Sequence, residues 1–127
     1  MRAAGRARRG IEAGLLSLDD AHAFVASGIA GHCVRAMVEP LGEDPDMAVA
    51  EAEAIENVLA IAGIGLEQVH HGDGLASWAV NRRGAALGHG IRTGLEDTAV
   101  LPDGRPAAGN GELVAAAAAI LAELASD

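Results

Sequence analysis

Three ionisable residues near one end of the chain have types and spacing that could do chemistry: Arg92, Glu96 and Asp97. If residues 88–97 form a β-strand, Arg92 and Glu96 project to one side, because side chains alternate between the two faces of a strand. A buried guanidinium needs a carboxylate partner, and a carboxylate at a strand end is placed to bind a cation or move a proton. The segment therefore predicts either a reactive site or a salt bridge that holds the strand in register.

Other ionisable residues lie in or directly after earlier apolar runs: Glu12, Glu39 and the pair His70–His71. Histidine is a common metal ligand. Adjacent side chains of an extended chain point to opposite sides, however, so the two histidines cannot easily reach one ion. We interpret them as part of a polar loop, with one histidine packing on a neighbour. His89 lies at the start of the predicted strand, at the end opposite to the acidic pair.

The apolar pattern predicts four strand–helix units. We expect strands over residues 11–16, 32–38, 66–69 and 88–97, and helices over 17–28, 44–62, 75–87 and 111–124. Ser17 and Asn110 are the expected N-caps of the first and last helices, and Asp44-Pro45 begins the second. This alternation predicts an α/β fold of parallel strands, in which polar residues gather at the carboxyl ends of the strands.

Composition limits the partners of the protein. The chain has 127 residues and a formal charge of −9, which argues against nucleic acid as the main partner. It contains no apolar run of the roughly 20 residues that cross a membrane, so no membrane partner is expected. We expect one domain over residues 10–127, after a basic tail or helix remnant over 1–9, and a cytoplasmic location. The single cysteine, Cys33, is expected to be a buried, inert thiol.

Three motifs together resemble the C-terminal end of the β-keto acid cleavage enzymes. They are Gly-His-Gly-Ile-Arg-Thr-Gly-Leu-Glu-Asp-Thr at 88–98, Leu-Pro-Asp-Gly at 101–104 and Gly-Asn-Gly-Glu-Leu-Val at 109–114. Weaker similarity extends back to Gly10. A (β/α)₈ barrel typically needs about 250 residues. The resemblance therefore implies four parallel βα units that correspond to the C-terminal half of such a barrel.

The resemblance also implies a reaction and a set of roles. Glu96 matches a zinc ligand of the family, Arg92 and Asp97 match residues that act in the reaction, and Glu12 matches a glutamate that contacts the substrate. The implied reaction is zinc-dependent: the β-keto acid is deprotonated, attacks the thioester of acetyl-CoA, and is split by retro-Claisen cleavage. The His-x-His zinc ligands of the family are absent from this sequence, and one carboxylate cannot hold zinc tightly. We therefore expect the site to need a complementary N-terminal half or a partner copy.

A non-catalytic protein is the alternative. In this interpretation the chain is a truncated or oligomerising half-barrel, and Arg92, Glu96 and Asp97 are structural. A half-barrel has two open edges and an uncovered apolar face, which favours association. We therefore predict a dimer or a higher oligomer, unless a complementary N-terminal half covers the open side.

Overall fold

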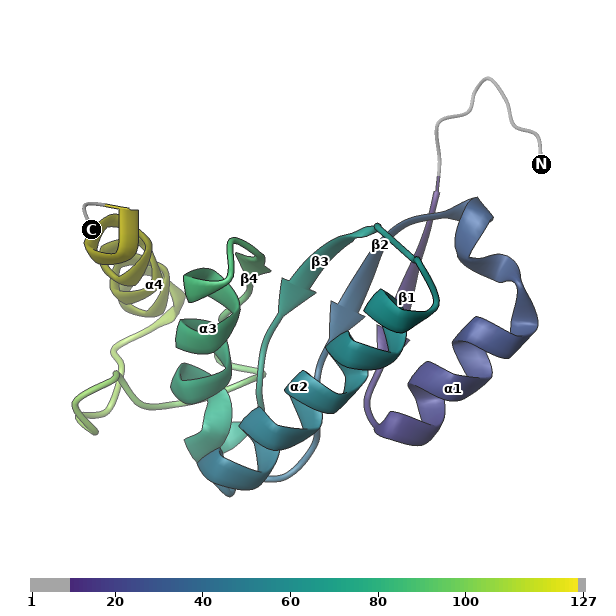
Figure 1. Ribbon diagram of the computed structural model, residues 1–127. Coiled ribbons are helices and arrows are strands. Elements are labelled where there is room, and N and C mark those ends of the chain that lie inside the picture. Colours follow the sequence, from purple (N-terminus) through teal and green to yellow (C-terminus); the bar gives the residue numbers. More distant parts are fainter. Residues whose placement is uncertain (1–9, 126–127) are drawn as a thin grey trace.

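The computed structural model describes residues 10–125, so the expected basic segment 1–9 and residues 126–127 lie outside the described part. Parallel strands alternate with helices in this part of the chain, which confirms the predicted α/β fold (Figure 1). The strands are β1 (Ile11–Leu15), β2 (Cys33–Val38), β3 (Glu67–His70) and β4 (Gly90–Ile91). The helices are α1 (Leu18–Ser27), α2 (Pro45–Ile61), α3 (Ser77–Ala86) and α4 (Asn110–Ala125), with short 3-10 helices η2 (Ile29–His32) and η3 (Gly74–Ala76).

The sheet is parallel throughout, in the order β1-β2-β3-β4. The register aligns Leu15 with Val38, Val38 with His70, and His70 with Ile91. The carboxyl ends of all four strands therefore lie at one level. Within residues 10–125, β1 and β4 each pair on one side only, so the sheet is open, as in half of a (β/α)₈ barrel.

β4 is shorter than the strand predicted over 88–97, and that part of the prediction is wrong. Only Gly90 and Ile91 pair with β3. The chain then turns, because the backbone N–H groups of Asp97 and Thr98 donate to the carbonyl of Gly94 at 2.9 and 3.1 Å. The turn takes Glu96 off the strand, so Arg92 and Glu96 do not share one strand face.

Local capping explains where the first two long helices begin. The hydroxyl of Ser17 accepts a hydrogen bond from the backbone of Asp20 at 3.1 Å, as the sequence predicted. Asp44 accepts from the backbone of Met47 at 3.1 Å, and Pro45 follows in the first turn. Asn110 differs from the prediction. It is the first residue of α4, but its side-chain oxygen accepts from the backbone of Leu95 at 2.8 Å, which ties α4 to the turn after β4.

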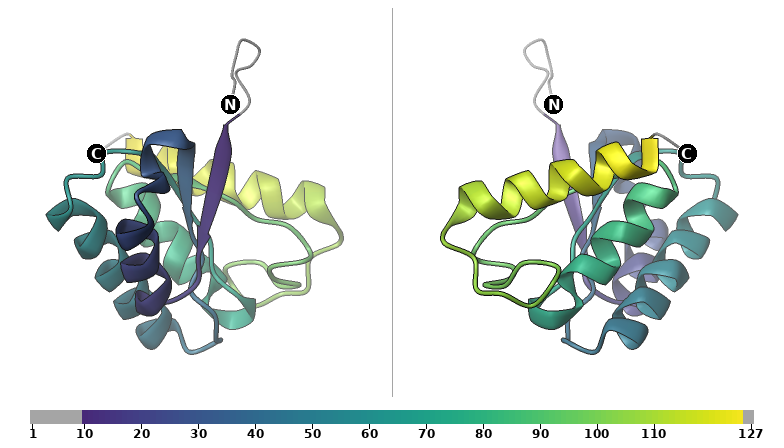
Figure 2. Two further views of the ribbon diagram at one scale, coloured as in Figure 1. Left: turned by 90° about the vertical axis from the view of Figure 1, so that its right-hand side faces the viewer. Right: turned by 90° about the vertical axis from the view of Figure 1, so that its left-hand side faces the viewer.

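Helices α1, α2 and α3 cover one face of the sheet, and α4 packs beyond α3 (Figures 1 and 2). The main core between these helices and the strands is aliphatic except for one phenylalanine: Leu15, Ala21, Phe24, Ala36, Val38, Ala52, Ile55 and Leu59. Burial of a large aliphatic side chain contributes roughly 1.5–3 kcal/mol, so this layer makes a large contribution to folding. Cys33 is half-buried rather than buried, with its thiol 3.6 Å from the carbonyl of Ile29.

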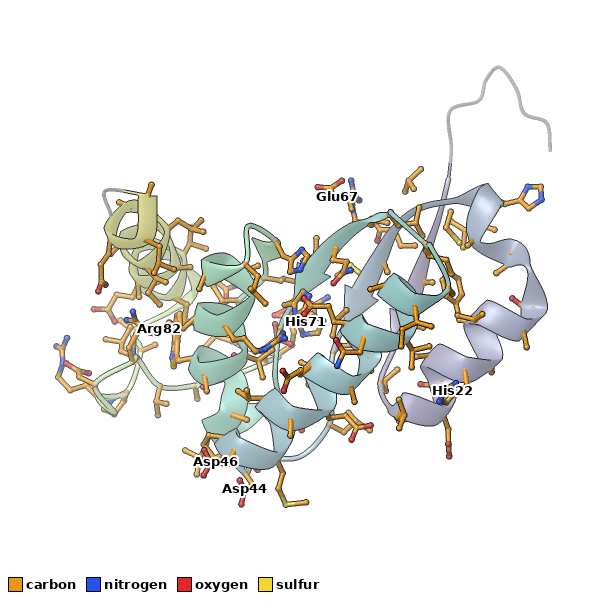
Figure 3. All side chains as sticks on the ribbon, in the orientation of Figure 1. His22, Asp44, Asp46, Glu67, His71 and Arg82 are labelled. Carbon is orange, nitrogen blue, oxygen red and sulfur yellow. The ribbon has the colours of Figure 1, made fainter. Side chains whose placement is uncertain are left out.

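The other face of the sheet carries many polar and small side chains, so the uncovered apolar face that we expected is limited to a narrow band. Near the amino ends, Arg35 makes ion pairs with Glu12 and Glu67. The next level that projects to this face contains Gly14, Met37, Val69 and Gly90, which form a narrow apolar band. Figure 3 shows Glu67 at the amino end of β3 and His71 beyond its carboxyl end. Within the described range, no helix combines the length and apolarity needed to cross a membrane.

Candidate active site

Three polar residues follow the carboxyl ends of neighbouring strands: Glu39 after β2, His71 after β3 and Arg92 after β4. The backbone N–H of Glu39 donates to the carbonyl of the last residue of β1 at 3.0 Å. In the same way His71 donates to the last residue of β2 at 3.1 Å, and Arg92 to the last residue of β3 at 3.3 Å. The three residues therefore lie at one level, one step beyond the aligned strand ends. Side chains alternate along a strand, so all three project to the face of the sheet that α1, α2 and α3 leave open.

Arg92 and Asp97 form a doubly hydrogen-bonded pair. Nε of Arg92 donates to Oδ2 of Asp97 at 3.3 Å, and Nη2 donates to Oδ1 at 3.0 Å. Asp97 is 8% exposed, whereas 44% of the Arg92 side chain is exposed. The hydrogen bonds to the Asp97 carboxylate raise the pKa of Arg92 above its ordinary value. The guanidinium thus orients a buried carboxylate and still has N–H groups free to bind an anion.

The imidazole of His71 lies between two carboxylates. Its Nε2 is 2.9 Å from Oε1 of Glu39, and its Nδ1 is 3.5 Å from Oδ1 of Asp97. The ring is buried, yet the angles give neither nitrogen a hydrogen bond within the described residues. Because a buried polar group without a hydrogen bond is costly, a small rotation of the ring or an incoming ligand would be favourable here. Glu39, His71, Asp97 and Arg92 form a continuous polar chain, which we call the strand-end cluster.

Glu96 lies apart from these contacts. Its side chain is exposed in the turn after β4, and it makes no hydrogen bond or ion pair within residues 10–125. It stands against Gly94, where any side chain would collide with its carboxylate. The described residues contain one group of three potential metal ligands, and Glu96 is not in it. A catalytic zinc site typically has three protein ligands. The described residues therefore do not by themselves fit a zinc ion at Glu96.

Glu12 lies at the amino end of the sheet. The register aligns it with Arg35 and Glu67, four residues below Glu39 on the neighbouring strand. At about 3.3 Å per residue, this separates it by roughly 13 Å along the strands from the strand-end cluster. Glu12 instead forms an ion pair with Arg35. The structure thus brings Arg92 and Asp97 together and leaves Glu12 at the far end of the same face.

His70 and His71 point to opposite sides of the sheet, as their adjacency in the chain predicted. The side chain of His70 is fully buried beneath α3, while His71 reaches Asp97 on the open face. The contact between His71 and Asp97 was not predicted from the sequence. The available signal was that both Glu39 and His71 directly follow predicted strands, where side chains from neighbouring parallel strands converge.

The fold and this cluster define an α/β protein with its candidate active site at the carboxyl ends of a parallel, half-barrel sheet. The sequence model of the family described as BKACE, beta-keto acid cleavage enzyme, matches residues 6–127. The chain therefore belongs to the beta-keto acid cleavage enzyme family. Among curated proteins, no match to the chain is found.

Proposed function

We propose that the chain supplies the acid–base part of a β-keto acid cleavage site, which transfers an acyl group between a β-keto acid and acetyl-CoA. The observation that carries this proposal is the doubly hydrogen-bonded Arg92–Asp97 pair at the carboxyl end of β4, backed by His71. Family membership supports β-keto acid cleavage as the reaction class. We further propose Glu96 as a ligand that this chain contributes to a zinc site whose other ligands come from outside the described residues.

The reaction needs a base beside an anionic substrate. Asp97 would accept the proton from the carbon between the ketone and the carboxylate of the β-keto acid. The electron pair left on that carbon attacks the thioester carbonyl of acetyl-CoA, a C–C bond forms, and the CoA thiolate leaves. That thiolate then attacks the original ketone, and retro-Claisen cleavage yields a new acyl-CoA and the carbanion of acetoacetate, to which Asp97 would return the proton. The zinc ion would polarise the ketone.

Each residue of the strand-end cluster has a distinct role in this proposal. Arg92 keeps Asp97 in one orientation, and its exposed N–H groups bind the substrate carboxylate. His71 and Glu39 support Asp97 from the side opposite to Arg92, and His71 can take up part of the transferred charge. We propose that strands from a second copy or a complementary chain cover the open face and complete the zinc ligands.

Exchange of acyl groups between a β-keto acid and acetyl-CoA tests the proposal. The full chain is incubated with zinc, alone and with a chain that carries the His-x-His motif, and new acyl-CoA species are measured by mass spectrometry. We expect turnover that Asp97→Asn abolishes and that Arg92→Lys weakens, with folding monitored by circular dichroism. Absence of turnover in every combination, or equal turnover by Asp97→Asn, contradicts the proposal.

A non-catalytic, oligomerising protein is the second candidate. It is favoured by the link that the backbone of Gly74 makes to the carbonyl of Asp97 at 2.6 Å, since this gives the Asp97 turn a structural role. In that case Arg92→Ala should unfold the chain rather than only abolish its activity. Light scattering at micromolar concentration tests association, which the oligomerising candidate requires: a monomer with a cooperative thermal transition contradicts it, and leaves a complementary chain as the partner of the first candidate.

A further inference from the structure

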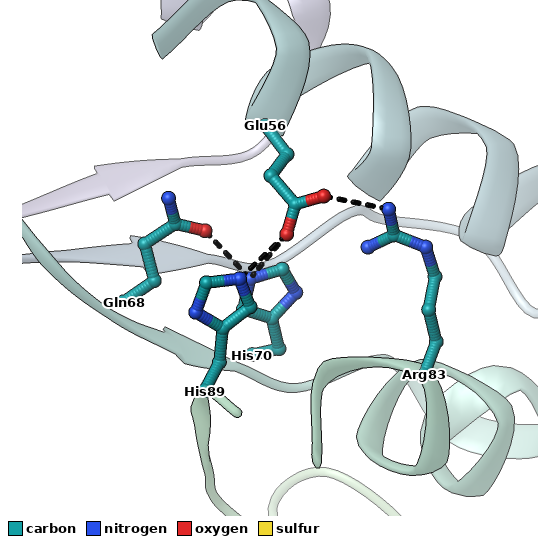
Figure 4. A network of polar contacts seen from close by, with 5 residues as sticks. All are labelled: Glu56, Gln68, His70, Arg83 and His89. Atoms are coloured by element: carbon teal, nitrogen blue, oxygen red, sulfur yellow. Dashed lines mark hydrogen bonds and ion pairs between the residues drawn. The ribbon is translucent and has the colours of Figure 1, made fainter. Parts of the chain in front are cut away.

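A second polar cluster lies on the face of the sheet that the helices cover, and the proposed reaction does not use it. Glu56 on α2, His70 on β3 and His89 before β4 bring one carboxylate oxygen and two imidazole nitrogens within 4.8 Å of one another. Nε2 of His89 is 2.6 Å from Oε2 of Glu56, and Nε2 of His70 is 3.8 Å from the same oxygen (Figure 4). We call these residues the Glu56 cluster.

Tight contact between α3 and β3 surrounds His70, and His89 stacks on its ring. The imidazoles of His70 and His89 are stacked, with centroids 4.6 Å apart and an interplanar angle of 6°. Gly84 allows this approach, since a Cβ atom there would lie 2.7 Å from Cβ of His70. The stacked rings direct their Nε2 atoms toward the same carboxylate, as Figure 4 shows. The three donor atoms are thus close together. The lone pair of an imidazole nitrogen lies in the plane of its ring, so a shared ion requires the partly exposed ring of His89 to turn out of the stack.

We propose that Glu56, His70 and His89 bind a divalent transition-metal cation of the zinc class. Two imidazoles and one carboxylate are a donor set found in zinc proteins, where a fourth position is left for water. Bonds of about 2.0–2.1 Å place tetrahedral ligand atoms about 3.3 Å apart. The separations of 2.6 and 3.8 Å from the carboxylate oxygen lie on either side of this value, and all three donor atoms lie within 4.8 Å of one another, so rotation of the side chains would bring them to metal-binding distances.

The neighbours of the Glu56 cluster suit this role. Arg83 donates to Oε1 of Glu56 at 2.7 Å and so orients the carboxylate with Oε2 toward the histidines. Burial pushes the pKa of Glu56 up, but hydrogen bonds from Arg83 and His89 outweigh it and hold the pKa below its usual range. Burial lowers the pKa of His70 to about 4, so its imidazole is neutral near pH 7. An ionised carboxylate and a neutral imidazole are the forms that bind metal.

An ion has a route to the Glu56 cluster and a candidate fourth ligand. His89 is 23% exposed and lines an open groove between the end of α3 and α4, together with Ala85, Gly88 and Leu121. Oε1 of Gln68 lies 2.9 Å from Nε2 of His70. The amide oxygen of Gln68 is therefore placed to fill the fourth position if water does not.

Metal titration of the tag-free, chelator-treated full chain tests the proposal. We expect Co²⁺ to bind with a stoichiometry of one, to give visible absorption bands of a four-coordinate site, and to be displaced by Zn²⁺. His89→Gln and Glu56→Gln should each weaken binding by at least the roughly 10–100-fold typical of lost outer partners. Two controls should leave it unchanged: His22→Gln, an exposed histidine on α1, and Glu96→Gln on the opposite face.

Imidazole ¹⁵N NMR of the wild-type chain provides a readout that does not depend on the folding of any variant. Zn²⁺ should shift the Nε2 resonances of His70 and His89 and leave those of His22 unchanged. No saturable binding by the wild type, or binding unaffected by His89→Gln, overturns the proposal. Loss of the same binding in Glu96→Gln also overturns it, because the ion then lies at the proposed active site. The Glu56 cluster can bind metal whether or not the chain cleaves β-keto acids.

Discussion

Arg92 and Asp97 lie five residues apart and meet side by side, with Nε and Nη2 of the guanidinium at 3.3 and 3.0 Å from the two carboxylate oxygens. The short turn at Gly94 makes this possible, because it reverses the chain directly after β4. The pair closes the turn and at the same time presents the exposed part of Arg92 to the open face of the sheet.

Removal of Arg92 should destabilise the protein, because the buried carboxylate of Asp97 loses its partner. We expect Arg92→Ala to lower the free energy of unfolding by about 1–3 kcal/mol. Arg92→Lys should recover only part of this loss, since an ammonium group cannot make two parallel hydrogen bonds. The measurement is urea denaturation. The control is Arg105→Ala, which breaks an exposed pair with Asp103 and should cost less than about 0.5 kcal/mol. Equal losses at the two sites would contradict the importance of burial.

Gly14 leaves room for the carboxylate of Glu39. A Cβ atom at position 14 would lie 2.5 Å from Oε2 of Glu39, so Gly14→Ala should push the carboxylate away from His71. Because the carboxylate is the flexible end of its side chain, we expect a loss of stability below about 1 kcal/mol. The ¹⁵N resonance of His71 Nε2 should shift. Gly31→Ala is the matched control, since no atom lies within 4 Å of its added Cβ. An unchanged His71 resonance in Gly14→Ala would show that the two side chains do not interact.

Gly84 and Gly111 should respond in opposite directions to alanine. Alanine is favoured over glycine in a helix interior by about 1 kcal/mol. At position 84, however, an added Cβ atom would lie 2.7 Å from Cβ of His70, so Gly84→Ala should destabilise the protein despite its better helix propensity. At position 111 nothing lies within 4 Å, and Gly111→Ala should be neutral or stabilising. Unfolding free energies measured by denaturation compare the two. Stabilisation by Gly84→Ala would contradict the close contact between α3 and β3.

The buried His70 should make the metal-free protein less stable in mild acid. Burial lowers the pKa of His70 from 6.5 to about 4, so the unfolded chain binds a proton in this range that the folded chain does not. The free energy of unfolding should therefore be highest above pH 6.5. It should fall as the pH drops toward 4, by up to roughly 3 kcal/mol. Denaturation with chelator present, at a series of pH values, measures this.

His70→Gln should flatten that part of the pH profile, while His22→Gln, whose imidazole is exposed, should leave it as in the wild type. The carboxylate of Glu56 adds a further loss at lower pH, since its pKa is also held below the usual value. A wild-type profile that is flat between pH 6.5 and 4.5 would contradict a neutral, buried His70.

Local patterns in the sequence were sufficient to predict the order of strands and helices. Ser17, Asp44 and Pro45 act on backbone groups within one turn of themselves, so the starts of α1 and α2 followed from a few adjacent residues. The opposite directions of His70 and His71 followed from strand geometry alone. The motif around Arg92 and Asp97 indicated the family, which the match over residues 6–127 confirms.

Contacts between segments far apart in the chain were beyond those patterns. The end of β4 depends on the turn at Gly94, and Asn110 secures that turn from 15 positions away. Glu56, His70 and His89 come from three segments, and the two rings stack because the pairing of β3 with β4 brings His89 beside His70. The sequence by itself determined the parallel α/β order, because hydrophobic periodicity and caps act over a few residues. It also determined the family, because the motifs that indicate it are continuous stretches of the chain. Only the tertiary structure decided which charges meet, because such contacts depend on distances between elements that no local rule contains.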